Sequence, residues 1–301
     1  MEGKRMAFTA VKRLVMNHKF HRINKHYKTD PVVGERAMIQ RSGKDPVEVL
    51  FYYPRTRTNM PVFVEIHGGA WIGLDAVDDD KYCRRLADEL DAFVVNVNYK
   101  RLYERPFPYQ QEEAADVVRW LLDNAGQLGI DPERIVISGG SAGGHIAAGV
   151  AVMLEKSGIK VAGQLLEVPF LDFTEVEKVR MESAKNLFKT LFALYPSKIP
   201  LDSDMISPGT RTSDEQLKRL APAVIIVCGR CPLHEQGQEY AERLRRAGTL
   251  VDIKMYENGY HGFGTEKAEE MPEQYYLRED CFWYKVAQTR NLFERRGIMK
   301  Q

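Results

Sequence analysis

Hydrophobic and polar residues follow two different rhythms along this 301-residue chain. Short apolar runs rich in β-branched residues predict strands at 47–53, 61–66, 92–97, 134–137, 161–168, 222–228 and 250–256. Apolar residues that recur every three or four positions predict helices at 78–90, 108–125, 235–247 and 274–297. Strands and helices that alternate in this way are typical of an α/β fold, with a mostly parallel sheet covered by helices on both faces.

Two segments depart from the alternation. Residues 1–45 begin with a basic amphipathic helix, in which Phe8, Val11, Leu14, Val15 and His18 recur at helical spacing. Such a helix serves as a membrane-surface segment, as a transit segment, or as an element packed on the rest of the protein, which is the interpretation that we favour. Residues 172–212 contain three prolines and many Phe and Leu residues, and they predict a helical insertion. We expect the two segments to form a cap over a core made of residues 46–171 and 213–301.

A glycine-rich turn at residues 137–144 carries the first candidate for chemistry. It reads Ile-Ser-Gly-Gly-Ser-Ala-Gly-Gly, so a G-x-S-x-G pentapeptide joins a buried strand to a small-residue helix. Glycines at 139 and 143 remove the Cβ atoms that would collide in so sharp a turn, and Ser141 is then exposed at its tip as a nucleophile. The alternatives are an ordinary strand-to-helix turn and a phosphate loop, although no Lys follows Gly144 as a phosphate loop requires.

A second glycine-rich turn, His67-Gly68-Gly69-Ala70-Trp71, follows the strand predicted at 61–66. Two consecutive glycines leave main-chain N–H groups unobstructed, so they can point at one developing oxyanion. The alternative is a plain turn at a strand end. After the last predicted strand comes Tyr260-His261-Gly262-Phe263, which places a candidate general base, His261, after the serine in chain order.

Four motifs occur in an order shared by one known family: HGGAW at 67–71, GGSAGG at 139–144, Ser207-Pro208, and Tyr260-His261-Gly262-Phe263. Together they resemble the hormone-sensitive-lipase-like branch of the α/β-hydrolases, the carboxylesterases and acetyl esterases, over about residues 45–295. The resemblance implies the α/β-hydrolase fold with a small helical cap. It also implies acyl transfer, with Ser141 as the nucleophile, His261 as the proton carrier, and the N–H groups of Gly68, Gly69 and Ala142 as the oxyanion hole.

The chain departs from this family where an acid should orient the histidine. The family has an Asp after the strand at 222–228, and Cys231 stands at that position here. A thiol supplies no fixed negative charge unless its pKa falls well below about 8.5. Asp172, at a neighbouring strand end, is our first candidate for the acid, and Glu235 is the alternative. Three alternatives stay open. Asp172 can instead be a helix N-cap or anchor the lid, Glu235 can instead interact with a helix dipole, and the site can lack an acid altogether.

Cys228 and Cys231 also form a C-x-x-C pair. A thioredoxin-like dithiol is disfavoured because Cys228 lies in a predicted buried strand. A zinc site of Cys231, His234 and His261 is disfavoured because no second spaced pair completes it. We therefore expect four reduced thiols and no metal.

Composition and charge limit the kinds of partner that we expect for this protein. The chain has 43 basic and 42 acidic residues, a balance that argues against an extended nucleic-acid surface. No apolar stretch approaches the roughly 18 residues that cross a bilayer, and the N-terminus lacks a secretory pattern, so we expect a cytoplasmic protein without a membrane span. Homo-oligomerisation stays open.

The sequence thus predicts a serine carboxylester hydrolase that acts on small, short-acyl esters through an acyl-enzyme intermediate and needs no cofactor. An amidase or formamidase on the same scaffold stays open, because both reactions need the same nucleophile and oxyanion hole. A small-ligand-binding protein with a degraded triad and little turnover also stays open, because of Cys231. The acyl-chain length and the alcohol of the substrate are left undetermined.

Overall fold

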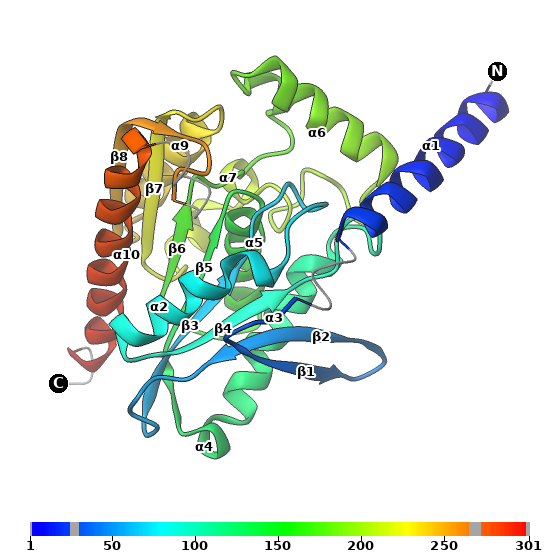
Figure 1. Cartoon of the computed structure of the whole chain (residues 1–301). Helices are drawn as coiled ribbons and strands as arrows, with labels where there is room; N and C mark the ends of the chain where they lie inside the picture. The colour runs from blue at the N-terminus through cyan, green and yellow to red at the C-terminus, as the bar shows by residue number, and fades with distance from the viewer. Residues whose placement is uncertain (1, 25–29, 265–271, 299–301) are drawn as a thin grey trace.

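A twisted sheet of eight strands runs through the centre of the computed structural model, which describes residues 2–24, 30–264 and 272–298 (Figure 1). The strand order is β1-β2-β4-β3-β5-β6-β7-β8. The neighbouring pairs from β4 to β8 are parallel, whereas β2 runs antiparallel to both β1 and β4. The bounds are β1 (Glu35–Arg41), β2 (Lys44–Tyr52), β3 (Met60–Ile66), β4 (Phe93–Asn98), β5 (Ile130–Gly140), β6 (Gly163–Glu167), β7 (Ala223–Arg230) and β8 (Val251–Tyr260).

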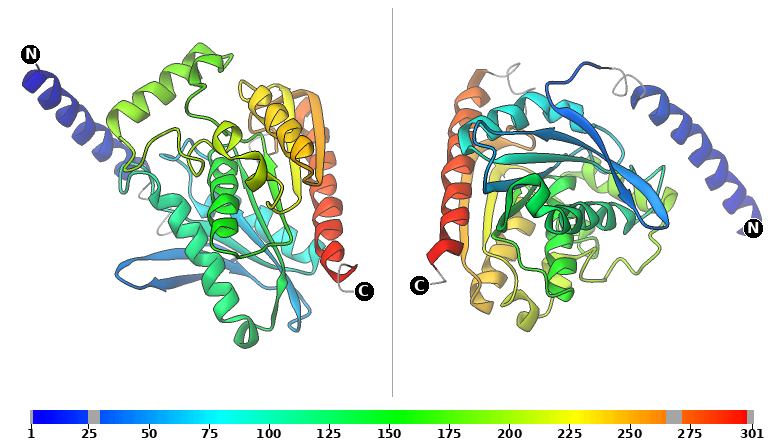
Figure 2. Two further views of the ribbon diagram at one scale, coloured as in Figure 1. Left: turned by 180° about the vertical axis from the view of Figure 1, so that it is seen from behind. Right: turned by 90° about the horizontal axis from the view of Figure 1, so that it is seen from below.

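Helices cover both faces of this sheet (Figure 2). On one face α2 (Asp80–Leu90) packs against α10 (Pro272–Ile298), and on the other α3 (Tyr109–Asp123) packs against α5 (Ala142–Lys156). Helix α9 (His234–Ala247) packs on β7 and β8. The remaining short helices are η2 (Ala76–Asp79), α4 (Ala125–Leu128), η3 (Val176–Lys178), α7 (Pro208–Arg211) and α8 (Asp214–Leu217). The predicted α/β-hydrolase architecture is confirmed.

Strand β1 was not among the predicted elements. Its sequence, ERAMIQR, mixes charged and apolar residues, and most of its side chains stay partly or fully exposed, as an edge strand allows. The chain also crosses over after β3, so that β4 lies between β2 and β3 in the sheet. Consecutive runs at 47–53 and 61–66 therefore do not pair with each other, because β2 pairs with β1 and β4 instead.

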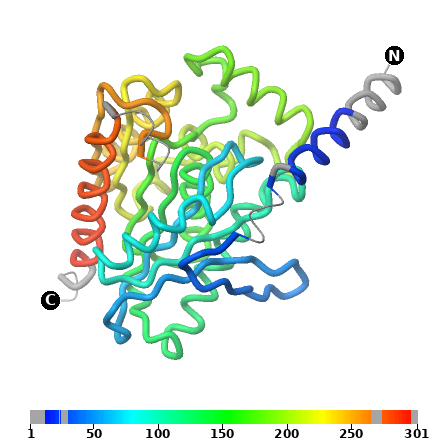
Figure 3. The backbone as a smooth tube through the Cα atoms, in the orientation of Figure 1, coloured from blue at the N-terminus to red at the C-terminus, as the bar shows by residue number. Residues whose placement is uncertain are grey.

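The long helices of the two predicted cap segments lie together above one end of the sheet (Figures 1 and 3). Residues 35–41, which the prediction assigned to the first of these segments, instead form the edge strand β1. Helix α6 (Glu182–Leu194) lies above the sheet, and α1 (Glu2–Ile23) runs beside it and away from the body. Tyr195, just after α6, donates a hydrogen bond to Asn17 of α1 at 2.8 Å.

The favoured expectation that α1 packs its apolar stripe on the protein differs from the structure at two positions. Leu14 is 71 % exposed and Val15 is 61 % exposed, whereas Met16 and Phe20 pack against the core. The side chains at positions 8 and 11 lie outside the described residues. None of the helices within the described ranges is long and apolar enough to cross a membrane.

Candidate active site

Ser141 stands at a strained turn between β5 and α5. Its φ of 55° and ψ of −115° are unusual for a residue with a side chain. The turn is possible because Gly139 and Gly143, two residues to either side, carry no side chain: a Cβ on Gly143 would collide with the main-chain carbonyl of Ile66 and come within 2.6 Å of that of His67. The N–H of Ser141 donates to the Glu167 carbonyl at 2.8 Å, which fixes the tip of the turn against β6.

His261 connects Ser141 to a third side chain. It follows β8 directly, is solvent-exposed, and places Nε2 at 2.8 Å from the Ser141 Oγ. Its other ring nitrogen, Nδ1, lies 3.0 Å from the Cys231 Sγ. The structure therefore brings together a serine, a histidine and a cysteine from the ends of β5, β8 and β7.

The two carboxylates proposed as acids make other contacts. Asp172 is buried, and its carboxylate accepts from the N–H and the hydroxyl of Thr174, both at 2.6 Å, and from the hydroxyl of Thr210. Glu235 forms an exposed ion pair with Arg180. The structure thus gives Nδ1 of His261 a thiol partner, where the sequence interpretation placed Asp172 first and Glu235 second.

The surroundings of Cys231 favour its charged form. A hydrogen bond from the Cys228 thiol is the largest influence; burial opposes it, while the His261 ring and the Leu233 N–H, at 3.3 Å from the sulfur, act in the same direction as Cys228. Together they lower the pKa of Cys231 to about 5. The pKa of Cys228 is raised, because its thiol is the donor of this pair and is itself buried.

The second glycine turn lies directly opposite Ser141. A Cβ on Gly68 would come within 3.7 Å of the Ser141 Cβ, so the two turns approach closely. Gly69, Ala70 and Trp71 all have positive φ, which curls this loop tightly after β3. Gly68, Gly69 and Ala142 line the same cavity as Ser141 and His261.

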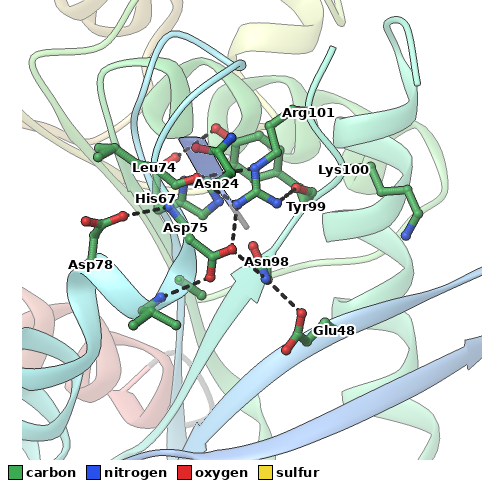
Figure 4. Close-up of polar contacts among 12 residues, drawn as sticks. Asn24, Glu48, His67, Leu74, Asp75, Asp78, Asn98, Tyr99, Lys100 and Arg101 are labelled. Atoms are coloured by element: carbon green, nitrogen blue, oxygen red, sulfur yellow. Dashed lines mark hydrogen bonds and ion pairs between the residues drawn. The ribbon is translucent and has the colours of Figure 1, made fainter. Parts of the chain in front are cut away.

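A buried polar network holds this loop from behind (Figure 4). The Tyr99 hydroxyl donates to the Gly68 carbonyl at 3.0 Å, and its ring stacks on the His67 ring with 4.2 Å between centroids. Arg101 pairs with Asp75 at 2.8 Å and donates to the Leu74 carbonyl. Burial lowers the pKa of His67 to about 3, so this ring is neutral and acts as a structural spacer.

Trp71 ties the other side of the loop to α5. Its indole N–H donates to Nδ1 of His145 at 3.1 Å, and Nε2 of His145 donates to the Ile206 carbonyl at 2.8 Å. Burial lowers the pKa of His145 to about 4, so it stays neutral and can accept from Trp71. The sequence interpretation treated neither Trp71 nor His145 as a support of the site.

A cavity of about 590 Å³ opens onto Ser141 and His261 and has two chemically different ends. The end beneath α6 is apolar, lined by Phe170, Met181, Ala184, Leu187, Phe188 and Leu233. The end between α2 and α10 is polar, lined by Glu65, Tyr82, Arg85, Glu167, Glu279 and Lys285. The polar end was missed from the sequence, although charged residues inside apolar strands, such as Glu65, were the available signal.

Within the polar end, Lys285 and Glu167 form a buried ion pair at 2.8 Å. Burial lowers the pKa of Lys285, but the paired Glu167 carboxylate is the main cause that reverses this, so the pKa of Lys285 lies well above its ordinary value. Glu65 is 6 % exposed, and its Oε2 has no hydrogen-bond partner among the described residues. Burial, with Asp79 as a second cause, raises the pKa of Glu65 to about 8.

The cysteines and their neighbours bear on the dithiol and zinc-site alternatives. All four cysteines are free and buried. Within residues 2–24, 30–264 and 272–298, no group of three or more His, Cys, Asp or Glu side chains is arranged to hold a metal ion. The ring of His234 instead contacts the Cys231 carbonyl through Nδ1 at 3.0 Å.

Comparisons with known proteins agree with this geometry. A family model described as an alpha/beta hydrolase fold matches residues 63–265. An arylesterase of Saccharolobus solfataricus is 30% identical over 239 residues, which cover 78% of each chain. The carboxylesterase NlhH of Mycobacterium tuberculosis is 31% identical over 241 residues, 76% of this chain and 75% of its own.

Two solved structures illustrate the match in three dimensions. The thermostable carboxylesterase EstE1, cloned from a metagenomic library, superposes with a TM-score of 0.77 at 24% identity, over 93% of this chain and 97% of its own. A bacterial heroin esterase superposes with a TM-score of 0.76 at 26% identity, over 92% of this chain and 90% of its own.

Proposed function

Because this chain belongs to the α/β-hydrolase family and is a hydrolase of the carboxylesterase kind, we propose that it cleaves carboxylic esters with Ser141 as nucleophile and His261 as proton carrier. The observation that carries the proposal is the 2.8 Å contact between the Ser141 Oγ and Nε2 of His261, at the mouth of a ligand-sized cavity.

The reaction follows from the side chains at this mouth. His261 accepts the Ser141 proton as Oγ attacks the ester carbonyl, and the carbonyl oxygen becomes an oxyanion. The N–H groups of Gly68, Gly69 and Ala142 are the donors that we assign to this oxyanion. His261 then protonates the leaving alcohol, and water releases the acyl group from Ser141 by the same steps in reverse order.

The strained backbone at Ser141 supports this role. Residues held at unfavourable φ and ψ persist only where the surroundings over-determine them, and they cluster at active sites. Here Gly143 and the two supported loops fix the turn, so that the nucleophile is aligned before the substrate binds.

The size and lining of the cavity indicate the class of substrate. Its volume of about 590 Å³ lies within the range of sites for drug-sized molecules, and far exceeds the space that an acetate ester of a small alcohol fills. We propose a small-molecule ester whose apolar part lies beneath α6. The preference for short acyl groups remains a prediction, and a series of 4-nitrophenyl esters of increasing acyl length measures it.

Replacement of the serine tests the function. Ser141→Ala should lower kcat on an activated ester by about 10³-fold or more, because it removes the hydroxyl that forms the acyl-enzyme in this proposal. Ser157→Ala, at the far end of the same helix, is the matched control and should keep wild-type kcat. Undiminished turnover by Ser141→Ala would refute the assignment. Faster cleavage of a matched anilide than of the ester would favour the amidase alternative.

A further inference from the structure

The side chain behind His261 lies where a serine hydrolase needs an anion. In a triad, the histidine must carry its proton on the nitrogen remote from the serine, and the group facing that nitrogen accepts this hydrogen bond. In this chain Nδ1 faces the Cys231 sulfur at 3.0 Å. Asp172 and Glu235 are engaged by Thr174, Thr210 and Arg180 instead.

Two nitrogen groups lie within hydrogen-bond distance of the Cys231 sulfur, and the Cys228 thiol lowers the pKa of Cys231 further. The His261 ring approaches at 3.0 Å from the loop after β8, and the Leu233 N–H approaches at 3.3 Å from the turn before α9. The turn itself is fixed, because the Cys231 N–H donates to the Cys228 carbonyl at 3.0 Å. Cys231 is only 2 % exposed, so these donors rather than water solvate the sulfur.

The other polar groups near Cys231 do not compete for its sulfur. His234 of α9 contacts the Cys231 carbonyl rather than its side chain. Arg230 of β7 turns outward and donates to the Tyr260 hydroxyl. The environment of the sulfur is therefore rich in hydrogen-bond donors, as sites that hold a thiolate are.

We propose that Cys231 acts as a thiolate that positions His261 and stabilises its protonated ring, in the place usually taken by a carboxylate. This inference rests on the proposed Ser141–His261 function and adds its third group. At rest the thiolate accepts from Nδ1–H, so Nε2 is bare and faces the Ser141 hydroxyl. When Oγ attacks, the proton moves to Nε2, and the imidazolium forms between the thiolate and the oxyanion.

A neutral thiol at this position would do the opposite. It would donate its own proton to Nδ1 and leave the ring proton on Nε2, which is the tautomer that cannot accept from Ser141. Activity must therefore appear as the coupled pair of Cys231 and His261 loses one proton, and the apparent pKa of the rate belongs to the pair.

The charge state of Cys231 is tested without reference to activity. The ultraviolet absorbance of thiolates is followed during a pH titration of the folded wild type and of Cys231→Ser. We expect one thiolate that forms with a midpoint near pH 5 in the wild type and is missing from Cys231→Ser. A midpoint above about 8, the ordinary range of a free thiol, would overturn the proposal.

The positioning role is tested by kinetics on an activated ester. Cys231→Ala should lower kcat by about 10³- to 10⁴-fold while KM changes little, and Cys231→Asp should stay within about tenfold of the wild type. In Cys231→Ala the rise of kcat/KM should also move to lower pH, because the histidine loses the anion that favours its charged form. A role in folding alone would not move this profile.

Control variants separate the outcomes. Cys83→Ala, in α2 and remote from His261, should keep the wild-type kcat and pH profile, and thermal unfolding of every variant checks the fold. If Cys231→Ala keeps kcat within about threefold of the wild type, this proposal fails although Ser141-dependent hydrolysis stands. If no variant, wild type included, shows Ser141-dependent hydrolysis, the proposed function fails even where the thiolate titrates as expected.

Discussion

Glu65 provides a prediction that depends only on burial and charge. It lies in β3 between Val64 and Ile66, opposite Ser138 of β5 and Asn96 of β4, in a strand whose other interior positions are apolar. Its Oε2 has no hydrogen-bond partner among the described residues, and Lys285, whose charge favours the ionised form of Glu65, is paired with Glu167. The folded protein therefore favours the neutral form of this carboxyl.

The cost of this burial depends on pH in a fixed direction. The folded-state pKa is about 8, above the ordinary value of 4.5. Below pH 4.5 both states hold the proton and nothing is lost. Between these values the native state keeps a proton that the unfolded state releases, so stability falls as pH rises, by about 1.4 kcal/mol per pH unit. At pH 7 the free energy of unfolding is lowered by about 3 kcal/mol, and above pH 8 this loss grows no further.

Replacing Glu65 by glutamine removes the titration but keeps the shape. We expect Glu65→Gln to be as stable as the wild type near pH 4.5. As pH rises the wild type loses stability and the variant does not, so the variant should be about 3 kcal/mol more stable than the wild type at pH 7. The assay is urea unfolding at pH 5, 6, 7 and 8, analysed by linear extrapolation with a common m value. Glu235→Gln, an exposed residue paired with Arg180, is the control. Parallel stability curves for wild type and Glu65→Gln would refute the reasoning.

Two further predictions concern the site. Gly143→Ala should lower kcat by about 100-fold and also reduce stability, since the new Cβ would collide with the carbonyls of Ile66 and His67 and separate the two turns, which kinetics and urea unfolding measure; activity within about twofold of the wild type would contradict the close approach. Asp172→Asn and Glu235→Gln should each keep kcat within about threefold, although Asp172→Asn should unfold more easily because Thr174 and Thr210 lose a charged acceptor. A loss of about 10³-fold in either would instead identify that carboxylate as the acid.

Local chemistry explains why the sheet and the two glycine turns could be predicted from the sequence. The chain passes from a strand to a helix within a few residues, and so sharp a turn requires glycines such as Gly139 and Gly143. The strand before each glycine turn is a continuous run of β-branched residues. The predicted end of the helix at 235–247 was also close to the observed one: α9 ends at Ala247, and the following Gly248 adopts the left-handed conformation that a helix end favours.

The parts that could not be predicted depend on contacts between distant segments. Asp172 follows β6 at the active edge of the sheet, so a carboxylate near His261 was a reasonable expectation, but the hydroxyl of Thr210, 38 residues away, holds it instead. The polar end of the cavity needs Glu65, Glu167 and Lys285 to meet from β3, β6 and α10. No sequence pattern relates these three positions, because their distance is set by strand order and by the packing of α10.

The replacement at position 231 separates two properties that an aspartate would combine. The location of the third group is set by the backbone, since the ends of β7 and β8 are neighbours and bring Cys231 to His261 whatever the side chain is. Its charge is set by the surroundings, and a carboxylate brings most of that charge with it, whereas a thiol must be ionised by donors. Cys228, which is buried in β7, is the largest influence that lowers the pKa of Cys231. Under the proposal that Cys231 acts as a thiolate, the two cysteines form one functional unit, in which Cys228 favours the ionised form of Cys231 and Cys231 orients His261.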